Sequence, residues 1–149
     1  MIKSESTRDK KGEETGSYIQ MFVYRVPKKN HGAMADAQTK LATIFKKHGI
    51  LRSEFFQLSS TTKTFKGFTS IYEMMMSANH DNNRKDDGED EQDEIWLELE
   101  HYKDEKEKDE VIARIGQDPN AGPLFGQVMG LVTEGSSSIQ GDFRRLRLG

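Results

Sequence analysis

The sequence predicts an α+β fold of the ferredoxin-like, split βαβ type, with a four-stranded antiparallel sheet and two main helices on one face. Two observations lead to this prediction. Apolar residues alternate along four stretches and recur at helical spacing in others, in the order strand, helix, strand, strand, helix, strand. The first strand is also apolar on both faces, so the sheet face opposite the helices must be covered. A sheet from a second copy would cover it, and we therefore expect a homodimer that closes a dimeric α+β barrel.

The chain has 149 residues, which suits one domain with a core. The apolar fraction is only 34% and the mean hydropathy is -0.81, but the deficit is concentrated in residues 1–16 and 79–94. Without these two segments the apolar fraction rises to about 41%, an ordinary value for a globular domain. We therefore expect a disordered polar tail at 1–16 and a single domain at 17–149, with an acidic loop insertion at about 77–94.

Charge and composition exclude several classes of function. The net charge is -3, and no basic stripe suggests a nucleic acid partner. The absence of cysteine excludes disulfides and thiolate chemistry. No apolar run suggests a signal peptide or a membrane span. The prediction is a soluble, cytoplasmic protein without a membrane or nucleic acid partner.

The first half of the domain begins with a strand that Pro27 ends. A helix follows, with Asn30 as its N-cap and Gly49 in the left-handed C-cap position. The predicted elements of this half are a strand at 17–27, a helix at 31–48, a strand at 50–59 and a short helix at 68–76.

The second half contains the clearest strand, EIWLELEHY at 94–102, because its apolar residues alternate strictly. The helix that follows opens with acidic residues, as the helix dipole favours. The remaining predicted elements are a helix at 104–115, a Gly-interrupted apolar segment at 121–132 and a last strand at 138–148.

Several short motifs resemble those of the YbaA-like family, a branch of the dimeric α+β barrels. They are FVYRVP in the first strand, KHGILR at the helix-to-strand junction, LEHY at the end of the third strand, QDP after the second helix and SIQGDF in the last strand. The resemblance covers residues 17–148. It implies the fold and dimerisation but no catalytic residues, since the family has no established reaction.

The acidic loop, NHDNNRKDDGEDEQDE at 79–94, partly fits a calcium-binding loop. Asn83, Asp87, Gly88 and Glu94 occupy four template positions, but Lys85 falls where an oxygen ligand is required. A strand follows in place of the exiting helix. We interpret the loop as a solvated insertion, with contact to a basic partner as the second interpretation, and we predict no metal site.

One face of the third strand carries the candidate functional residues Trp96, Glu98, Glu100 and Tyr102. In the dimer these residues would face the cavity between the two sheets. A second row would join them if it lines the same cavity: Arg52, Glu54 and Phe56. Carboxyl groups in a half-apolar pocket have raised pKa values and can act as acid or base. The alternatives are a solvated strand face, or Arg52 paired with a glutamate across the dimer interface.

The histidines do not form a helical zinc motif. His48 lies near a helix C-terminus, where a structural role is expected. His101, at the end of the third strand, is a candidate proton carrier.

Two functions are compatible with these observations, and neither requires a cofactor. The first is small-molecule binding in a pocket between sheet and helices. The second is a cofactor-independent monooxygenase or isomerase acting on a small aromatic or carbonyl compound. In the first case Trp96, Arg52, Glu54, Phe56 and Tyr102 would bind the ligand; in the second, Glu98, Glu100 and His101 are the catalytic candidates.

Overall fold

The computed structural model describes residues 16–59, 63–77 and 93–149. Nearly all of the predicted tail and acidic loop lies outside these residues. The elements are β1 (Tyr18–Pro27), the 3₁₀ turn η1 (Lys28–Asn30), α1 (His31–Lys47), β2 (Arg52–Gln57), α2 (Ile71–Ser77), β3 (Asp93–Tyr102), α3 (Glu105–Gly116), α4 (Ala121–Leu131) and β4 (Ile139–Arg144).

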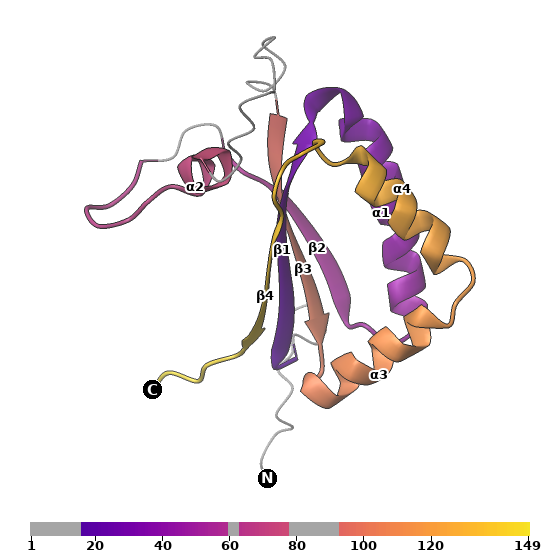
Figure 1. Ribbon diagram of the computed structural model, residues 1–149. Helices are drawn as coiled ribbons and strands as arrows, with labels where there is room; N and C mark the ends of the chain where they lie inside the picture. Colours follow the sequence, from indigo (N-terminus) through magenta and orange to yellow (C-terminus); the bar gives the residue numbers. More distant parts are fainter. Residues whose placement is uncertain (1–15, 60–62, 78–92) are drawn as a thin grey trace.

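The four strands form one antiparallel sheet in the order β2-β3-β1-β4. This is the order of a ferredoxin-like domain, so the predicted fold is confirmed. Helices α1, α3 and α4 cover one face of the sheet, while the short α2 lies on the opposite side (Figure 1). The two main helices expected from the sequence are α1 and α3, and the Gly-interrupted apolar segment forms α4 beside them.

The main core lies between the sheet and the three helices. Tyr24, Trp96 and Tyr102 of the strands pack there with buried side chains of α1 such as Met34 and Leu41. A smaller cluster on the other face joins Val23 and Ile95 to Met75 of α2. The even-numbered residues of β1 and β3 therefore face the main helices, and the odd-numbered residues face away.

The ends of α1 are tied to the rest of the domain. Asn30 occupies the N-cap position, as expected, but its side chain makes no capping bond. It donates instead from Nδ2 to the Leu131 carbonyl at the end of α4, at 3.0 Å. At the other end, Gly49 has a φ of +114°, and the His48 carbonyl accepts hydrogen bonds from the Arg114 guanidinium of α3 at 2.7 and 3.0 Å.

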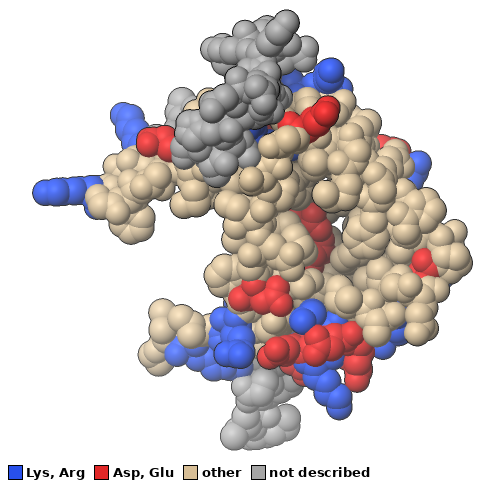
Figure 2. Space-filling model, in the orientation of Figure 1, with Lys and Arg blue, Asp and Glu red and all other residues tan. Residues whose placement is uncertain are grey.

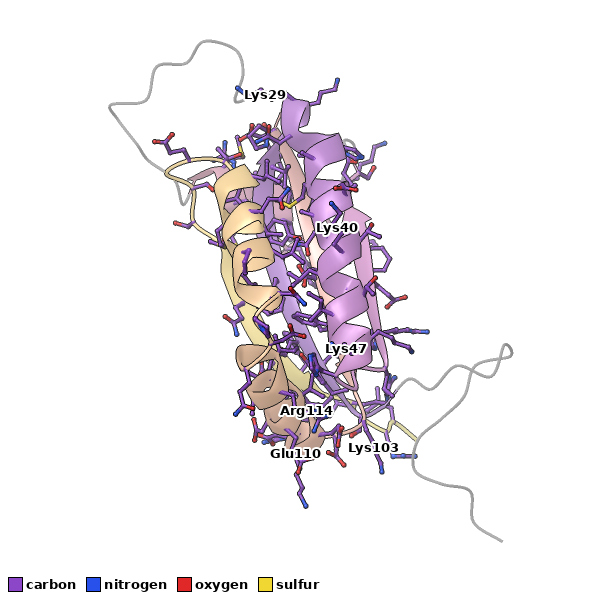
Figure 3. All side chains as sticks on the ribbon, turned by 90° about the vertical axis from the view of Figure 1, so that its right-hand side faces the viewer. Lys29, Lys40, Lys47, Lys103, Glu110 and Arg114 are labelled. Carbon is purple, nitrogen blue, oxygen red and sulfur yellow. The ribbon has the colours of Figure 1, made fainter. Side chains whose placement is uncertain are left out.

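The helical layer is seen directly in Figure 3, where α1 and α4 lie side by side and the labelled Lys40 and Lys47 project from α1. Within the described residues, no helix combines the length and the apolar character that crossing a membrane requires.

Candidate functional site

Two carboxyl groups lie beneath the main helices, in the centre of the sheet. The side chains of Glu98 and Glu100 follow each other on the helix-facing side of β3, and they are only 8% and 2% exposed. The antiparallel register places Phe22 of β1 opposite Glu98, and Ser53 of β2 opposite Glu100. Burying a carboxylate is costly unless its oxygens are hydrogen-bonded, so the partners of this pair determine what it can do.

Glu98 is held by donors from two elements. Its Oε1 accepts hydrogen bonds from the Tyr24 hydroxyl of β1 at 3.0 Å and from Nε2 of Gln38 in α1 at 3.2 Å. The same Gln38 nitrogen lies 3.0 Å from the Tyr24 hydroxyl oxygen. The three side chains therefore form a closed polar group within an otherwise apolar core, and they fix the position of the Glu98 carboxylate.

Glu100 bridges Glu98 and the edge strand β2. Its carboxyl group hydrogen-bonds to that of Glu98, and its Oε1 accepts from the Ser53 hydroxyl. Burial, followed by the adjacent Glu98, raises the pKa of Glu100 from its ordinary value of 4.5 to about 10. Glu100 is thus a neutral acid at pH 7, and it can donate its proton to Glu98.

Two tyrosines complete this polar layer as neutral groups. Burial and the nearby carboxyl groups raise the pKa of both Tyr24 and Tyr102 above the ordinary value for a phenol. The Tyr102 hydroxyl donates to Oε1 of Gln20 at 2.9 Å.

A cavity of about 580 Å³ opens beside Glu98, between the sheet and the three main helices. Figure 2 shows it as a hollow between the two layers, with acidic surface at its floor. Most of its wall is apolar, with Phe22, Phe45 and Phe125 contributing aromatic rings. The other lining residues are Gln20, Tyr24, Gln38, Leu41, Glu98, Lys108, Asp109, Ile112, Val128, Met129, Val132, Ser138, Ile139 and Gln140.

The polar residues from α3 in this lining are already bonded to each other. Nζ of Lys108 lies 2.7 Å from an Asp109 carboxylate oxygen and 3.8 Å from one of Asp142. Asp142 in turn accepts a hydrogen bond from the Tyr18 hydroxyl at 2.7 Å. The carboxylates of Asp109 and Asp142 therefore compensate the positive charge of Lys108.

Trp96, Glu98, Glu100 and Tyr102 lie together on one face of β3, as predicted. This face is not the one that was expected to line a cavity between two sheets. It packs beneath α1, α3 and α4 of its own chain and does not face the opposite side of the sheet, where a second copy was expected. Tyr102 and Trp96 are buried there without lining the cavity. Trp96 donates from Nε1 to Glu94 at 2.8 Å and packs edge-on against the ring of His31.

The second predicted row points to the opposite face of the sheet. Arg52 pairs with His101 and Glu54 with Leu99, both of which are on the odd-numbered side of β3. Phe56 also lies on that side and is 46% exposed. The expectation that this row joins the glutamates was wrong, because antiparallel pairing places Ser53 and Phe55 beside Glu100 and Glu98.

His101 also lies on the face away from the cavity. Its Nε2 is 2.6 Å from a carboxylate oxygen of Glu54, while Nδ1 is buried and has no hydrogen-bond partner within the described residues. The sheet separates it from Glu98, so it does not belong to this site. His48, as expected, has a structural contact: its Nε2 lies 2.7 Å from Asp118, just beyond α3.

Gln38 is the main site residue that the sequence analysis missed. It lies on the buried face of α1, between Met34 and Leu41 in an otherwise apolar series that continues to Phe45. A polar side chain at a core position needs a buried partner, so this interruption of the series was the available signal. The described residues contain no group of three or more His, Asp or Glu side chains that could hold a metal ion.

No protein-family model and no curated protein sequence matches the chain. Solved structures match its fold. SnoaB, a cofactor-independent oxygenase from Streptomyces nogalater, aligns with a TM-score of 0.50 and 10% identity over 89% of this chain and 97% of its own. A NipSnap family protein of unknown function from Agrobacterium tumefaciens gives 0.54 and 10%, over 91% and 93%.

Both neighbours belong to the dimeric α+β barrel superfamily. At 10% identity the likeness shows the fold alone. It confirms the predicted α+β architecture, whereas the narrower resemblance to the YbaA-like family stays a prediction. By fold, the chain is a ferredoxin-like α+β domain similar to the subunits of the dimeric α+β barrel proteins.

Proposed function

We propose that this protein binds a small, mostly apolar molecule in the cavity between the sheet and helices α1, α3 and α4. The observation that carries this proposal is the cavity itself, about 580 Å³ of largely apolar space with the Glu98 carboxyl group on its wall. Ligand pockets commonly measure about 300–1,000 Å³ and combine apolar walls with a few polar groups that orient the ligand.

The packing of the domain supports the same proposal. The open cavity leaves apolar side chains such as Phe125 and Met129 exposed to 40% and 63%, and apolar surface in water does not favour folding. A buried carboxyl group adds a further cost. A sequence under selection for stability alone would fill this space with larger side chains and replace Glu98, so both features fit a binding role.

A matched pair of substitutions tests the site. Gln140 on β4 and Gln57 on β2 are both exposed, and both lie on edge strands, but only Gln140 lines the cavity. Gln140→Trp should fill part of the cavity and weaken the binding of small aromatic probes at least tenfold, as measured by ligand-observed NMR. Gln57→Trp should leave probe binding unchanged. Equal binding by both variants, or no binding of any probe to the wild type, would refute the proposal.

Catalysis is a second candidate function, favoured by the proton shared between Glu98 and Glu100. A carboxylate in an apolar cavity can remove a proton from the carbon beside a carbonyl group. Returning that proton to another carbon isomerises the substrate. Reaction of the carbanion with dioxygen, with one oxygen atom entering the substrate and the other leaving as water, would make the protein a cofactor-independent monooxygenase.

Hydrogen exchange measures the proton transfer without knowledge of the natural substrate. A small aryl ketone such as propiophenone in D₂O should exchange its α-hydrogens faster with the protein than with buffer, and Glu98→Gln should remove this acceleration. If the wild type gives only the buffer rate for ketones that bind in the cavity, the catalytic proposal fails and the binding proposal stands.

We further propose that the face of the sheet opposite α1, α3 and α4, which α2 covers only in part, pairs with a second copy of the chain. This face carries half-buried Met21 and Leu99, with Phe56 and Phe143 exposed to 46% and 51%. The likeness in fold to the dimeric α+β barrel proteins supports this pairing. Native mass spectrometry should show a dimer, and Phe143→Glu should convert it to a monomer. The control Ala35→Glu on the exposed side of α1 should remain dimeric; a monomeric wild type would contradict the proposal.

A further inference from the structure

We infer that the ligand of the cavity is an organic cation, an amine with an aromatic or otherwise apolar body, whose N–H group is held by Glu98. This inference rests on the proposed binding function and adds the chemical class of the ligand to it. Three features of the described residues carry it: the balance of charge in the cavity, the acceptor capacity left on Glu98 and the aromatic rings in the cavity lining.

The charge of the cavity lining favours a cation. The acidic and basic residues in the lining are Glu98, Asp109 and Lys108. Lys108 is paired with Asp109 at 2.7 Å, so these two charges compensate each other. Within the described residues Glu98 forms no ion pair with a basic side chain; its partners are the neutral Tyr24 and Gln38. A ligand cation would supply the missing positive charge.

The hydrogen bonds of Glu98 leave room for about one further donor. A carboxylate offers about four acceptor positions. Tyr24 and Gln38 use two of them on Oε1, and the acid proton of Glu100 uses a third. The position that remains matches a single N–H group. A charged N–H donor binds a carboxylate roughly twice as strongly as a neutral donor, which favours an amine over an alcohol.

Aromatic rings line the same cavity as Glu98. Phe22, Tyr24, Phe45 and Phe125 all line the cavity, and the rings of Phe45 and Phe125 pack with their centroids 5.9 Å apart. The faces of such rings attract cations, and the interaction strengthens away from water. The same rings give an apolar surface to the body of the ligand. A carboxylate ligand has no counterpart here, because the Lys108 charge is already paired and Glu98 would repel it.

Three probes of similar size and different charge test this inference: 2-phenylethylamine, 2-phenylethanol and phenylacetate, titrated into the full-length protein at pH 7 by calorimetry. We expect the amine to bind at least tenfold more tightly than the alcohol, and phenylacetate to bind more weakly than both. Glu98→Gln should abolish the preference for the amine while binding of the alcohol persists. Glu110→Gln, an exposed carboxylate of α3 outside the cavity, should leave the order unchanged.

A second variant keeps the test decisive if Glu98→Gln does not fold. Lys108→Gln removes the lysine from the cavity lining and should increase the affinity for the amine, because Asp109 then adds to the negative potential. Equal binding of amine and alcohol to the wild type, tighter binding of phenylacetate, or a Lys108→Gln variant with unchanged amine affinity would overturn the inference. If neutral aromatic probes bind and amines do not, the cation inference fails alone; if no probe binds, the proposed binding function fails as well.

Discussion

The carboxyl groups of Glu98 and Glu100 share a hydrogen bond beneath α1, although the two groups would repel each other if both were ionised. Like-charged carboxylates at this separation cannot both ionise without a large cost, so one of them keeps its proton. Burial to 2% exposure makes Glu100 that residue. The pair therefore presents one negative charge to the cavity, and the protonated Glu100 lies next to Glu98.

This pair makes the stability of the fold dependent on pH. The pKa of Glu100 is raised to about 10 in the folded chain, so between its ordinary value and pH 10 the folded state binds the extra proton. The contribution of Glu100 to the free energy of unfolding then falls as pH rises through that range. Glu100→Gln keeps a hydrogen-bond donor and removes the titration, so between pH 5.5 and 8.5 its stability relative to wild type should rise by at least about 1.4 kcal/mol.

Urea denaturation at several pH values measures this difference. Glu110→Gln, an exposed residue labelled in Figure 3, is the matched control and should show the wild-type dependence on pH. If Glu100→Gln and wild type lose stability in parallel as the pH rises, Glu100 does not hold its proton in the folded chain.

A buried ion pair joins Arg25 near the end of β1 to Asp93 at the start of β3. Nη2 of Arg25 lies 2.8 Å from Asp93, both side chains are 3% exposed, and the Thr133 hydroxyl donates to the same carboxylate oxygen at 2.8 Å. Asp93→Ala leaves the arginine charge buried without this partner and should cost about 3–5 kcal/mol in the free energy of unfolding.

Replacing the whole group should restore much of that stability. Nε of Arg25 already lacks a hydrogen bond within the described residues, so the pair is imperfectly satisfied. The triple variant Arg25→Met, Asp93→Leu and Thr133→Val should be more stable than Asp93→Ala in chemical denaturation, because buried ion pairs are often replaceable by apolar groups. A triple variant less stable than Asp93→Ala would show that the group is needed for the strand ends to pair.

Asp118 gives a pH dependence of the opposite sign. Its hydrogen bond to His48, together with that from the Asn120 amide, lowers the pKa of this carboxyl group. Its contribution to stability is thus complete above the unfolded pKa and is lost as pH falls through the folded value. Asp118→Asn should lower the melting temperature at pH 6 and change it little near pH 2. A constant difference between these two pH values would contradict this assignment.

Gly49 links α1 to α3 through its backbone conformation. Its φ is +114°, and a Cβ atom there would lie 2.9 Å from Nη2 of Arg114. Gly49→Ala should cost about 1–3 kcal/mol, since L residues adopt this conformation only under strain. Gly32→Ala in the first turn of α1 meets nothing within 4 Å and should be neutral or stabilising. Thermal unfolding of the two variants tests this prediction, and equal melting temperatures would refute the assignment of strain to Gly49.

The arrangement of strands and main helices could be predicted because periodicity survives in each segment. The alternation at Trp96, Glu98, Glu100 and Tyr102 correctly placed these four residues on one face. The side on which that face lies could not be derived. Both faces of β1 are apolar, and Gln57 lies far along the chain from Asp93, so no short turn fixes the register of β2 against β3.

The site was less predictable than the fold for the same reason. Its polar group combines Tyr24, Gln38 and Glu98 from three different elements, and such an encounter depends on tertiary packing. The apolar cavity wall also depends on α4, whose glycines at 122, 126 and 130 obscure the helical pattern. A glutamine within the core stripe of α1 was the one local indication that a buried acceptor lay opposite it.

The adjacency of β2 and β3 has a consequence for how the chain folds. Their pairing begins at Gln57 and Trp96, so the ladder forms only after the two ends of the connecting segment, residues 58–95, come together. Loop closure slows folding when the ends are distant along the chain, although each doubling of loop length costs only about 0.6 kcal/mol in equilibrium stability. Gln57 and Trp96 are nonetheless paired directly across the ladder, so a tight hairpin turn could join the two strands. Shortening the connection would therefore speed assembly of the sheet far more than it would stabilise the finished domain.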